Sequence, residues 1–318
     1  YQKGIHDHDA CQIVLQVQPV LEQADLLRYD PMTRAIAQLF WVNLELILGT
    51  NAPRSDNAFA LHTQNTRVTQ AQEDWIARAQ SARQMQKAFG SQQALRQLEA
   101  DICLRVDEFL QKQPISPASE QDDLPSSQQI ARYLVEELSH EQPAFIISRY
   151  GRELADELKQ SLDDESWRQY QDSLSSLSGR VVARWQLTLA WLSALVDHKQ
   201  KSHLRHYLPE AAVLINADQR MEWRICEANT EIEISGLLGD HPSLKNRTLA
   251  FSLDSFLSRM AQHHEQTIPN YRRYLAVRQQ IIDEQRSALK LESFKPKPLT
   301  SFVRNRLINE AYLPIIGD

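Results

Sequence analysis

Glycine and cysteine are scarce in this sequence. Only 8 glycines occur among its 318 residues, so few positions can adopt the left-handed backbone conformation that tight hairpins and barrel corners need. This scarcity favours a helical protein. The three cysteines, Cys11, Cys103 and Cys226, are odd in number and far apart, which excludes a disulfide framework and a CxxC metal site. We therefore expect a reducing, cytoplasmic environment.

Long apolar runs are also absent. The two most apolar stretches, residues 35–49 and 181–197, are interrupted by polar and charged side chains, so neither is expected to span a membrane. With 42% hydrophobic residues, 24% charged residues and a formal net charge of −6, the composition is that of an ordinary globular protein. The chain begins at Tyr1 without an initiator methionine or a signal segment, and we interpret it as a piece of a longer protein.

The local motifs of several enzyme classes are missing as well. The sequence contains no GxxxxGK(S/T) phosphate loop, no GxGxxG, no GxSxG and no HExxH. Nucleotide binding, a nucleophile elbow and a zincin site therefore have no local support. We expect no catalytic residue and no cofactor site within this chain.

What the sequence does contain is helical periodicity over most of its first 208 residues. Asp30 followed by Pro31 is typical of a helix N-terminus, and Gly90 separates two long apolar-striped segments. Residues 50–68 are polar without a period, which predicts a loop. The expected helices cover 11–27, 31–48, 69–89, 91–112 and 181–198.

The period changes from helical to alternating after residue 208. The segments AVLIN (212–216), MEWRIC (221–226), EIEIS (231–235) and TLAFSL (248–253) alternate apolar and polar residues. They predict a small antiparallel sheet of three or four strands with one apolar face. Asp254 is then expected to cap a helix, and Pro269 to begin another that runs to about Leu289.

The predicted fold is therefore mainly α with minor β: helical bundles, then a small antiparallel β-sheet, then C-terminal helices. The stretch 113–127 combines prolines with serine and aspartate, which predicts a linker. The expected parts are an N-terminal helical region (1–112), the linker (113–127), a second helical region (128–208), the sheet (209–253) and a basic helical segment (254–318).

Two sets of residues could in principle bind a metal. His198, His203 and His206 lie close together in the sequence, but basic residues are interleaved with them, which favours a solvated helix end. Glu137 and His140 form one ExxH motif, whereas a di-iron bundle needs two such motifs and further carboxylates. We expect this to be a surface pair, so a metal-binding helical enzyme is the weakest of the functional alternatives.

Positive charge is concentrated near the end of the chain. Residues 270–306 hold nine Lys or Arg and three Asp or Glu, so this stretch carries 9 − 3 = +6. Four arginines, Arg272, Arg273, Arg278 and Arg286, fall along one expected helix and could contact the phosphates of a nucleic acid. The alternative is that this helix faces solvent or docks on an acidic protein surface.

The sequence of residues 232–318 is distinctive enough to compare with known families. Its most distinctive segment is FKPKPLTSFVRNRLINEAYLPIIGD (294–318), and GLLGDHP and LDSFL precede it. These segments resemble the region just before the AAA-type ATPase core of large bacterial ATPases described as involved in DNA repair. The resemblance implies that ATP and magnesium would be bound by a core beyond Asp318. No ATP-site residue is therefore expected within this chain.

The C-terminal residues are consistent with a segment that precedes an ATPase core. A helix is expected from Ser301 to Asn309, ended by Pro314, and four apolar residues, Phe302, Leu313, Ile315 and Ile316, would be exposed unless a partner covers them. We expect a non-catalytic accessory and coupling region that contacts an ATPase core or another protein module. The main alternative is a freestanding helical interaction scaffold. The sequence leaves the oligomeric state open.

Overall fold

The computed structural model describes residues 3–44, 58–115, 124–177, 179–217, 221–290 and 301–316, with the backbone alone at residue 3 and residues 58–71. The chain divides into two compact units, Tyr1–Arg259 (unit 1) and Met260–Asp318 (unit 2). Helices dominate both units, and the described residues contain two sheets of two strands each. The prediction of a mainly α fold with minor β is confirmed.

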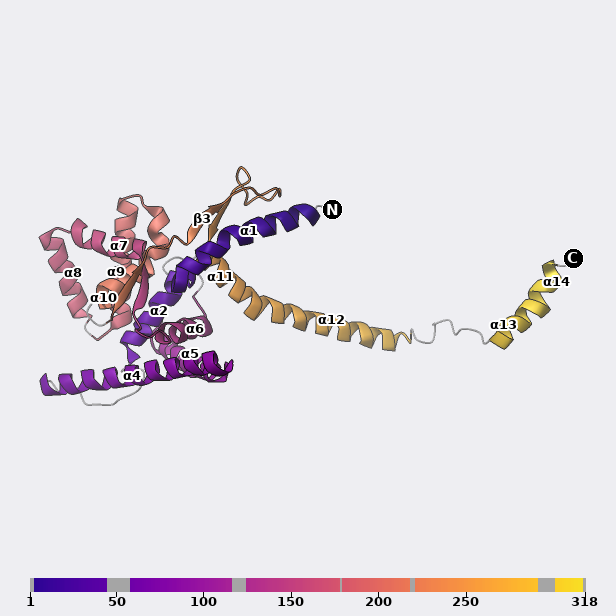
Figure 1. Ribbon diagram of the computed structural model, residues 1–318, viewed down its shortest axis with the longest axis horizontal. Helices are drawn as coiled ribbons and strands as arrows, with labels where there is room; N and C mark the ends of the chain where they lie inside the picture. The colour runs from indigo at the N-terminus through magenta and orange to yellow at the C-terminus, as the bar shows by residue number, and fades with distance from the viewer. Residues whose placement is uncertain are drawn as a thin grey trace. The chain divides into compact units, whose positions relative to one another are not determined.

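Unit 1 contains most of the helices and all the described strands (Figure 1). Its helices are α1 (Lys3–Ala24), η1 (Asp25–Arg28), α2 (Pro31–Val42), α4 (Ala58–Phe89), α5 (Gln93–Lys112), α6 (Ser127–Leu138), α7 (Arg149–Ser161), α8 (Asp164–Ser176), α9 (Val181–His198), η2 (Ser202–Tyr207), α10 (Leu208–Ala217) and α11 (Leu253–Gln262), the last of which extends past the division. Its strands are β1 (Phe145–Ser148), β2 (Trp223–Cys226), β3 (Glu231–Ile234) and β4 (Leu249–Ser252).

The centre of unit 1 is α2, which lies between α10 on one side and α6 on the other (Figure 1). Its start is fixed as the sequence predicts: Asp30 is in an extended conformation and accepts a 2.9 Å hydrogen bond from the backbone N–H of Thr33, and Pro31 occupies the first turn. Every residue from Pro31 to Trp41 is buried. A helix buried all round belongs to the core rather than the surface.

The long helices α4 and α5 form the predicted antiparallel pair. Gly90 sits between them with φ of +70°, a conformation that glycine adopts without the penalty a side chain would bring. The predicted stripe on α5 is buried at Leu98, Ile102, Val106 and Phe109, and α5 packs against α6. The predicted loop at 50–68 is wrong for residues 58–68, which belong to α4; the remainder lies outside the described residues.

The prediction of one antiparallel sheet of three or four strands at 209–253 is confirmed for two of its segments, β3 and β4, and is wrong for the other two. Residues 212–216 are part of the buried helix α10, while β2 pairs in parallel with β1, Phe145 opposite Trp223. Among the described strands, β3 and β4 are the pair that is antiparallel, with Ile232 opposite Phe251. Residues 212–215 are four consecutive apolar residues and do not alternate. A short apolar run is consistent with either a buried helix or a buried strand, which explains both the misassigned 212–216 and the unpredicted strand β1.

The regions expected as separate parts of unit 1 share one hydrophobic core. Buried residues of 1–112, 128–208 and 209–253 belong to a single cluster. The helix α9 contributes Trp185, whose indole N–H donates a 3.0 Å hydrogen bond to the carbonyl of Pro209 on α10. The expected linker lies largely outside the described residues, since 116–123 are not among them.

Unit 2 contains helices without a core. A π-helical turn, His263–Thr267, leads into α12 (Ile268–Ala288), and α13 (Ser301–Leu307) is followed by another π-helical turn, Ile308–Tyr312, and by α14 (Leu313–Ile316). No described residue from 260 to 316 is buried. The expectation that Pro314 ends the helix is wrong, because the chain stays helical to Ile316; a proline in the first turn of a helix costs little, since its N–H has no partner there.

No helix among the described residues has the length and apolar character needed to cross a bilayer.

Candidate functional site

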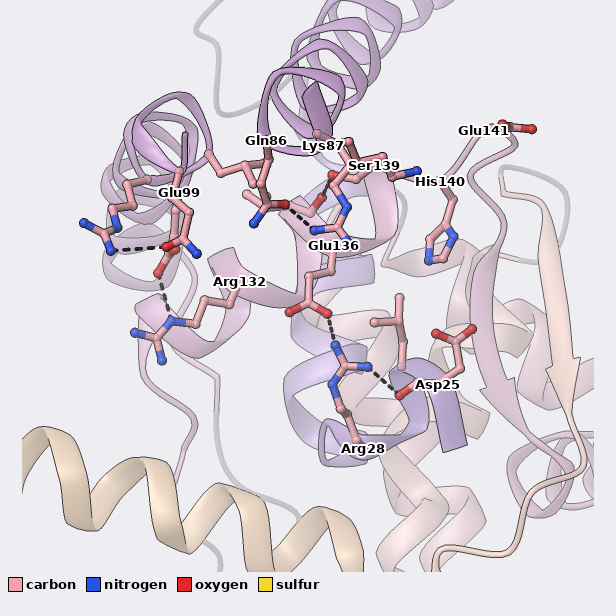
Figure 2. A pocket seen from close by; sticks show the side chains of 16 residues that line it. Asp25, Arg28, Gln86, Lys87, Glu99, Arg132, Glu136, Ser139, His140 and Glu141 are labelled. Atoms are coloured by element: carbon pink, nitrogen blue, oxygen red, sulfur yellow. Dashed lines mark hydrogen bonds and ion pairs between the residues drawn. The ribbon is translucent and has the colours of Figure 1, made fainter. Parts of the chain in front are cut away.

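A polar groove of about 750 Å³ opens on unit 1 (Figure 2). It lies where the hairpin between α4 and α5 meets the C-terminal half of α6, the residues after it, and η1. The groove is lined by Asp25, Leu26, Arg28, Arg83, Gln86, Lys87, Gln92, Leu95, Arg96, Glu99, Arg132, Val135, Glu136, Ser139, His140 and Glu141.

Ion pairs neutralise most of the charge on the η1 and α6 side of this groove. Arg28 is paired with Glu136, which also accepts a 2.9 Å hydrogen bond from the hydroxyl of Tyr29. Arg132 lies 2.9 Å from Glu99 of α5, and these two pairs are visible side by side in Figure 2. Burial, together with the neighbouring Glu136 carboxylate, raises the pKa of Tyr29 far above its usual range, so this phenol stays protonated and acts as a donor.

The hairpin side keeps its positive charge. Arg83 donates to the side-chain oxygen of Gln86, and Arg96 donates to that of Gln92 at 3.2 Å. Both acceptors are neutral amides, so neither guanidinium is neutralised. Lys87 has no hydrogen-bond or ion-pair partner among the described residues. Three cations therefore border the groove without a carboxylate partner in the part of the chain that the structure describes.

The four arginines predicted to contact phosphates lie in α12 of unit 2, and all four are exposed. Successive residues of a helix are rotated by about 100° around its axis. Arg272 and Arg286 therefore lie about 40° apart. Relative to Arg272, Arg278 is rotated by about 120° in one direction and Arg273 by about 100° in the other. Arg286 also lies 3.8 Å from Asp283. The arginines thus surround the helix and do not form one basic face.

The predicted docking residues at the end of the chain are exposed. Phe302 is 73% exposed, Leu313 52%, and Ile315 and Ile316 are each 77% exposed. The apolar residues of α12 share this property, since Tyr271, Leu275 and Ile281 are also exposed. The rings of Tyr271 and Tyr274 stack with their centroids 6.2 Å apart, but none of the described residues from 260 to 316 is buried.

The histidines do not converge as a metal site would require. Among the described residues no cluster of three or more His, Cys, Asp or Glu side chains could hold a metal ion. His206 lies on η2, where its Nε2 is 2.7 Å from Oδ2 of Asp254 at the start of α11. Asp254 also accepts a hydrogen bond from the backbone N–H of the adjacent Ser255 at 2.7 Å. The prediction that Asp254 caps the helix is wrong, because α11 begins at Leu253 and Asp254 is its second residue.

Glu137 is not on the surface, contrary to the prediction of an exposed Glu137–His140 pair. Its side chain is fully buried, and Oε2 accepts hydrogen bonds from the Tyr133 hydroxyl at 3.2 Å and from the backbone N–H of Ile146 at 3.4 Å. Oε1 has no partner among the described residues. Burial raises the pKa of Glu137 to about 7, against the opposing charge of Arg224.

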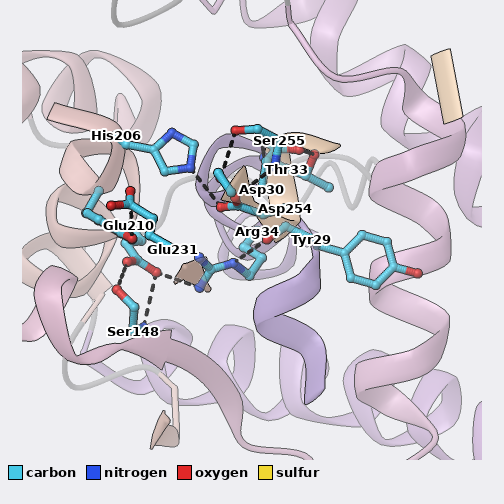
Figure 3. A network of polar contacts seen from close by, with 12 residues as sticks. Tyr29, Asp30, Thr33, Arg34, Ser148, His206, Glu210, Glu231, Asp254 and Ser255 are labelled. Carbon is cyan, nitrogen blue, oxygen red and sulfur yellow. Dashed lines mark hydrogen bonds and ion pairs between the residues drawn. The ribbon is translucent and has the colours of Figure 1, made fainter. Parts of the chain in front are cut away.

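A second buried polar network connects three elements of unit 1 (Figure 3). Arg34 of α2 lies 2.6 Å from Oε2 of Glu210 on α10, and both side chains are essentially inaccessible to solvent. Ser148, which ends β1, donates to the other Glu210 oxygen and accepts a 3.0 Å hydrogen bond from the backbone N–H of Gly151. Burial alone would lower the pKa of Arg34, but the Glu210 charge raises it, so Arg34 stays charged inside the core.

Sequence reasoning missed both the groove and these networks. The groove residues come from four elements spread over residues 25–141, and their charges resemble any solvated helix surface when read along the chain. Ser148 and Gly151 could have been found from the spacing of a serine N-cap three residues before a glycine, but nothing in the sequence indicates that Arg34 and Glu210, 176 positions apart, form a pair. No family model, curated protein or solved structure matches this chain.

Proposed function

We propose that this chain is a non-catalytic accessory and coupling module, in which unit 2 engages another protein module on behalf of unit 1. The observation that carries the proposal is the exposure of the apolar residues of unit 2. Isolated helices of this length are marginal in water, and helices in proteins gain most of their stability from packing. The helices of unit 2 bury no described side chain, so a covering partner would stabilise them.

The partner we propose is an AAA-type ATPase core. The support is the resemblance of residues 232–318 to the region before such cores, together with the exposure of Phe302, Ile315 and Ile316. Covering this surface would be favourable by about 25 cal/mol for each Å² of apolar area removed from water. ATP and magnesium would then be bound by the core and not by this chain.

The reading frame beyond Asp318 is the first test. A GxxxxGK(S/T) segment in the same frame supports the ATPase partner, whereas a stop codon directly after Asp318 would favour a freestanding interaction scaffold. Residues 1–318 should hydrolyse no ATP, and measurable turnover by them would contradict the proposal.

Coupling is tested with the core present. The variant Phe302→Ser/Ile315→Ser/Ile316→Ser should lose association with the ATPase core, measured by analytical ultracentrifugation. Leu104→Ser is the matched control, because Leu104 is 65% exposed on α5 of unit 1. Equal association of the triple variant and the wild-type chain would exclude these residues as the docking surface.

Contact with nucleic acid is a second candidate, favoured by the exposure of Arg272, Arg273 and Arg278 without a carboxylate partner among the described residues. Because these arginines surround α12, we expect weak, sequence-independent binding. Affinity for duplex DNA should then fall steeply with salt concentration. A flat salt dependence, or unchanged binding in Arg272→Gln/Arg273→Gln/Arg278→Gln, would remove this candidate.

The compartment we propose is the cytoplasm. All three cysteines are free thiols, which suits a reducing environment.

A further inference from the structure

The two sides of the polar groove on unit 1 differ in charge, because, among the described residues, the basic residues of one side are paired with carboxylates and those of the other side are not. On the η1 and α6 side the basic residues Arg28 and Arg132 are paired with carboxylates. On the hairpin side Arg83, Lys87 and Arg96 are not, so their positive charge remains available to a ligand. Glu141, at the end of the lining, is the acidic residue without a basic partner among the described residues.

The three unpaired cations are close together in the fold. Arg83 and Lys87 are one helical turn apart at the end of α4, and Arg96 is in the first turn of α5, just after the Gly90 turn. All three line the same groove and all three are exposed. Two guanidinium groups and an ammonium around one concavity match the oxygens of phosphate groups, because guanidinium binds phosphate with two parallel hydrogen bonds and ammonium acts as a compact charge.

The lining residues also favour a ligand without an aromatic base. No Phe, Tyr or Trp is among the lining residues, and the apolar ones are Leu26, Leu95 and Val135. Single-stranded nucleic acids and nucleotides are normally held by stacking of bases on aromatic side chains. The volume of about 750 Å³ is that of a small-molecule site.

From these observations we propose that the groove binds a small polyanion with two or more phosphate groups, held by Arg83, Lys87 and Arg96. All the lining residues of this site belong to unit 1, whereas the proposed docking residues belong to unit 2. A failure of one proposal therefore leaves the other standing.

The test is isothermal titration calorimetry of residues 1–318 with inorganic pyrophosphate at low ionic strength. Pyrophosphate should bind the wild-type chain, and Arg83→Gln/Lys87→Gln/Arg96→Gln should weaken binding by about tenfold or more, since hydrogen bonds to charged groups are the strong ones. The control is Arg105→Gln, because Arg105 is an exposed arginine of α5 outside the groove, paired with Glu108 at 3.2 Å. This control should bind within about twofold of wild type.

Each other outcome overturns the proposal. Absence of pyrophosphate binding to the wild-type chain excludes a phosphate site, and equal weakening in Arg105→Gln shows only a general charge effect. Citrate binding as tightly as pyrophosphate would indicate a carboxylate site. Binding of an acidic glutamate peptide without pyrophosphate binding would make the groove a protein interface. Far-ultraviolet circular dichroism of the triple variant should match wild type, because all three side chains are exposed.

Discussion

At the scale of the residue, Glu137 is a buried carboxyl group that ionises at a higher pH than an exposed one. Burial raises its pKa to about 7, above the value of about 4.3 that it has in an unfolded chain. The native state therefore binds one more proton than the unfolded state between these two values. Stability contributed by this group is full below pH of about 4 and is lost as the pH rises through about 7.

Glu137→Gln should remove this pH dependence while keeping a polar side chain of the same size. The free energy of unfolding of the wild-type chain should fall between pH 5 and pH 8 by about 3 kcal/mol more than that of the variant. Urea unfolding at the two pH values measures the difference. Glu141→Gln, which changes an exposed carboxyl nearby, should behave as wild type, and parallel wild-type and Glu137→Gln profiles would show that Glu137 is ionised in the native state.

Gly151 is the residue on which the Arg34–Glu210 pair depends most directly. A Cβ atom at this position would lie 2.7 Å from Glu210 Cγ, Cδ and Oε1, and the displaced carboxylate would leave Arg34 buried without its partner. Gly151→Ala should therefore destabilise unit 1 by about 2 kcal/mol or more. Gly4→Ala is the matched control, because a Cβ there meets no atom within 4 Å; equal stability of both variants would mean that Glu210 moves at no cost.

At the scale of the element, the contact between His206 and Asp254 joins η2 to α11. Burial alone would lower the pKa of His206, but the hydrogen bond and the charge of Asp254 raise it. Burial alone would raise the pKa of Asp254, but His206 lowers it. The pair is therefore fully charged between these two pKa values, and it weakens as the pH rises through the raised value of the histidine or falls through the lowered value of the aspartate.

His206→Gln should consequently destabilise unit 1 most at mildly acidic pH and least above the pKa of the histidine. We expect a loss of about 1 kcal/mol, because the imidazole is 34% exposed and solvent screens the pair. Thermal unfolding of wild type and variant across this pH range measures it. A loss that stays constant with pH would indicate packing of the ring and not its charge.

The helices also show which parts of the fold could be predicted from the sequence and which could not. Helices with a cap and an amphipathic stripe were predictable, as Asp30 and Pro31 show for α2 and as Leu98 and Ile102 show for α5. The helix α10 was not, because nearly all of its residues are buried, including Glu210, so the sequence shows no exposed polar face to reveal a helical period. The groove was not predictable either, because Arg83 and Arg132 line the same groove only once α4, α5 and α6 have packed together.

At the scale of the whole molecule, the two units differ in what stabilises their helices. In unit 1, α9 buries Trp185, Leu192 and Val196, so its amides should exchange with solvent only when the core opens. In unit 2, α12 buries no side chain. We expect α9 amides in the isolated chain to be protected by a factor of about 10³ or more, and α12 amides to exchange within about tenfold of the unfolded rate.

Hydrogen exchange with mass spectrometry of residues 1–318 measures both helices in one sample, so α9 is the internal control for α12. Addition of an ATPase core that covers unit 2 should slow exchange in α12 and leave α9 unchanged, because binding stabilises only the segment whose side chains it buries. If α12 were as protected as α9 in the isolated chain, its apolar residues would already be covered. They would then be unavailable to a partner, and the docking function proposed for unit 2 would have to be abandoned.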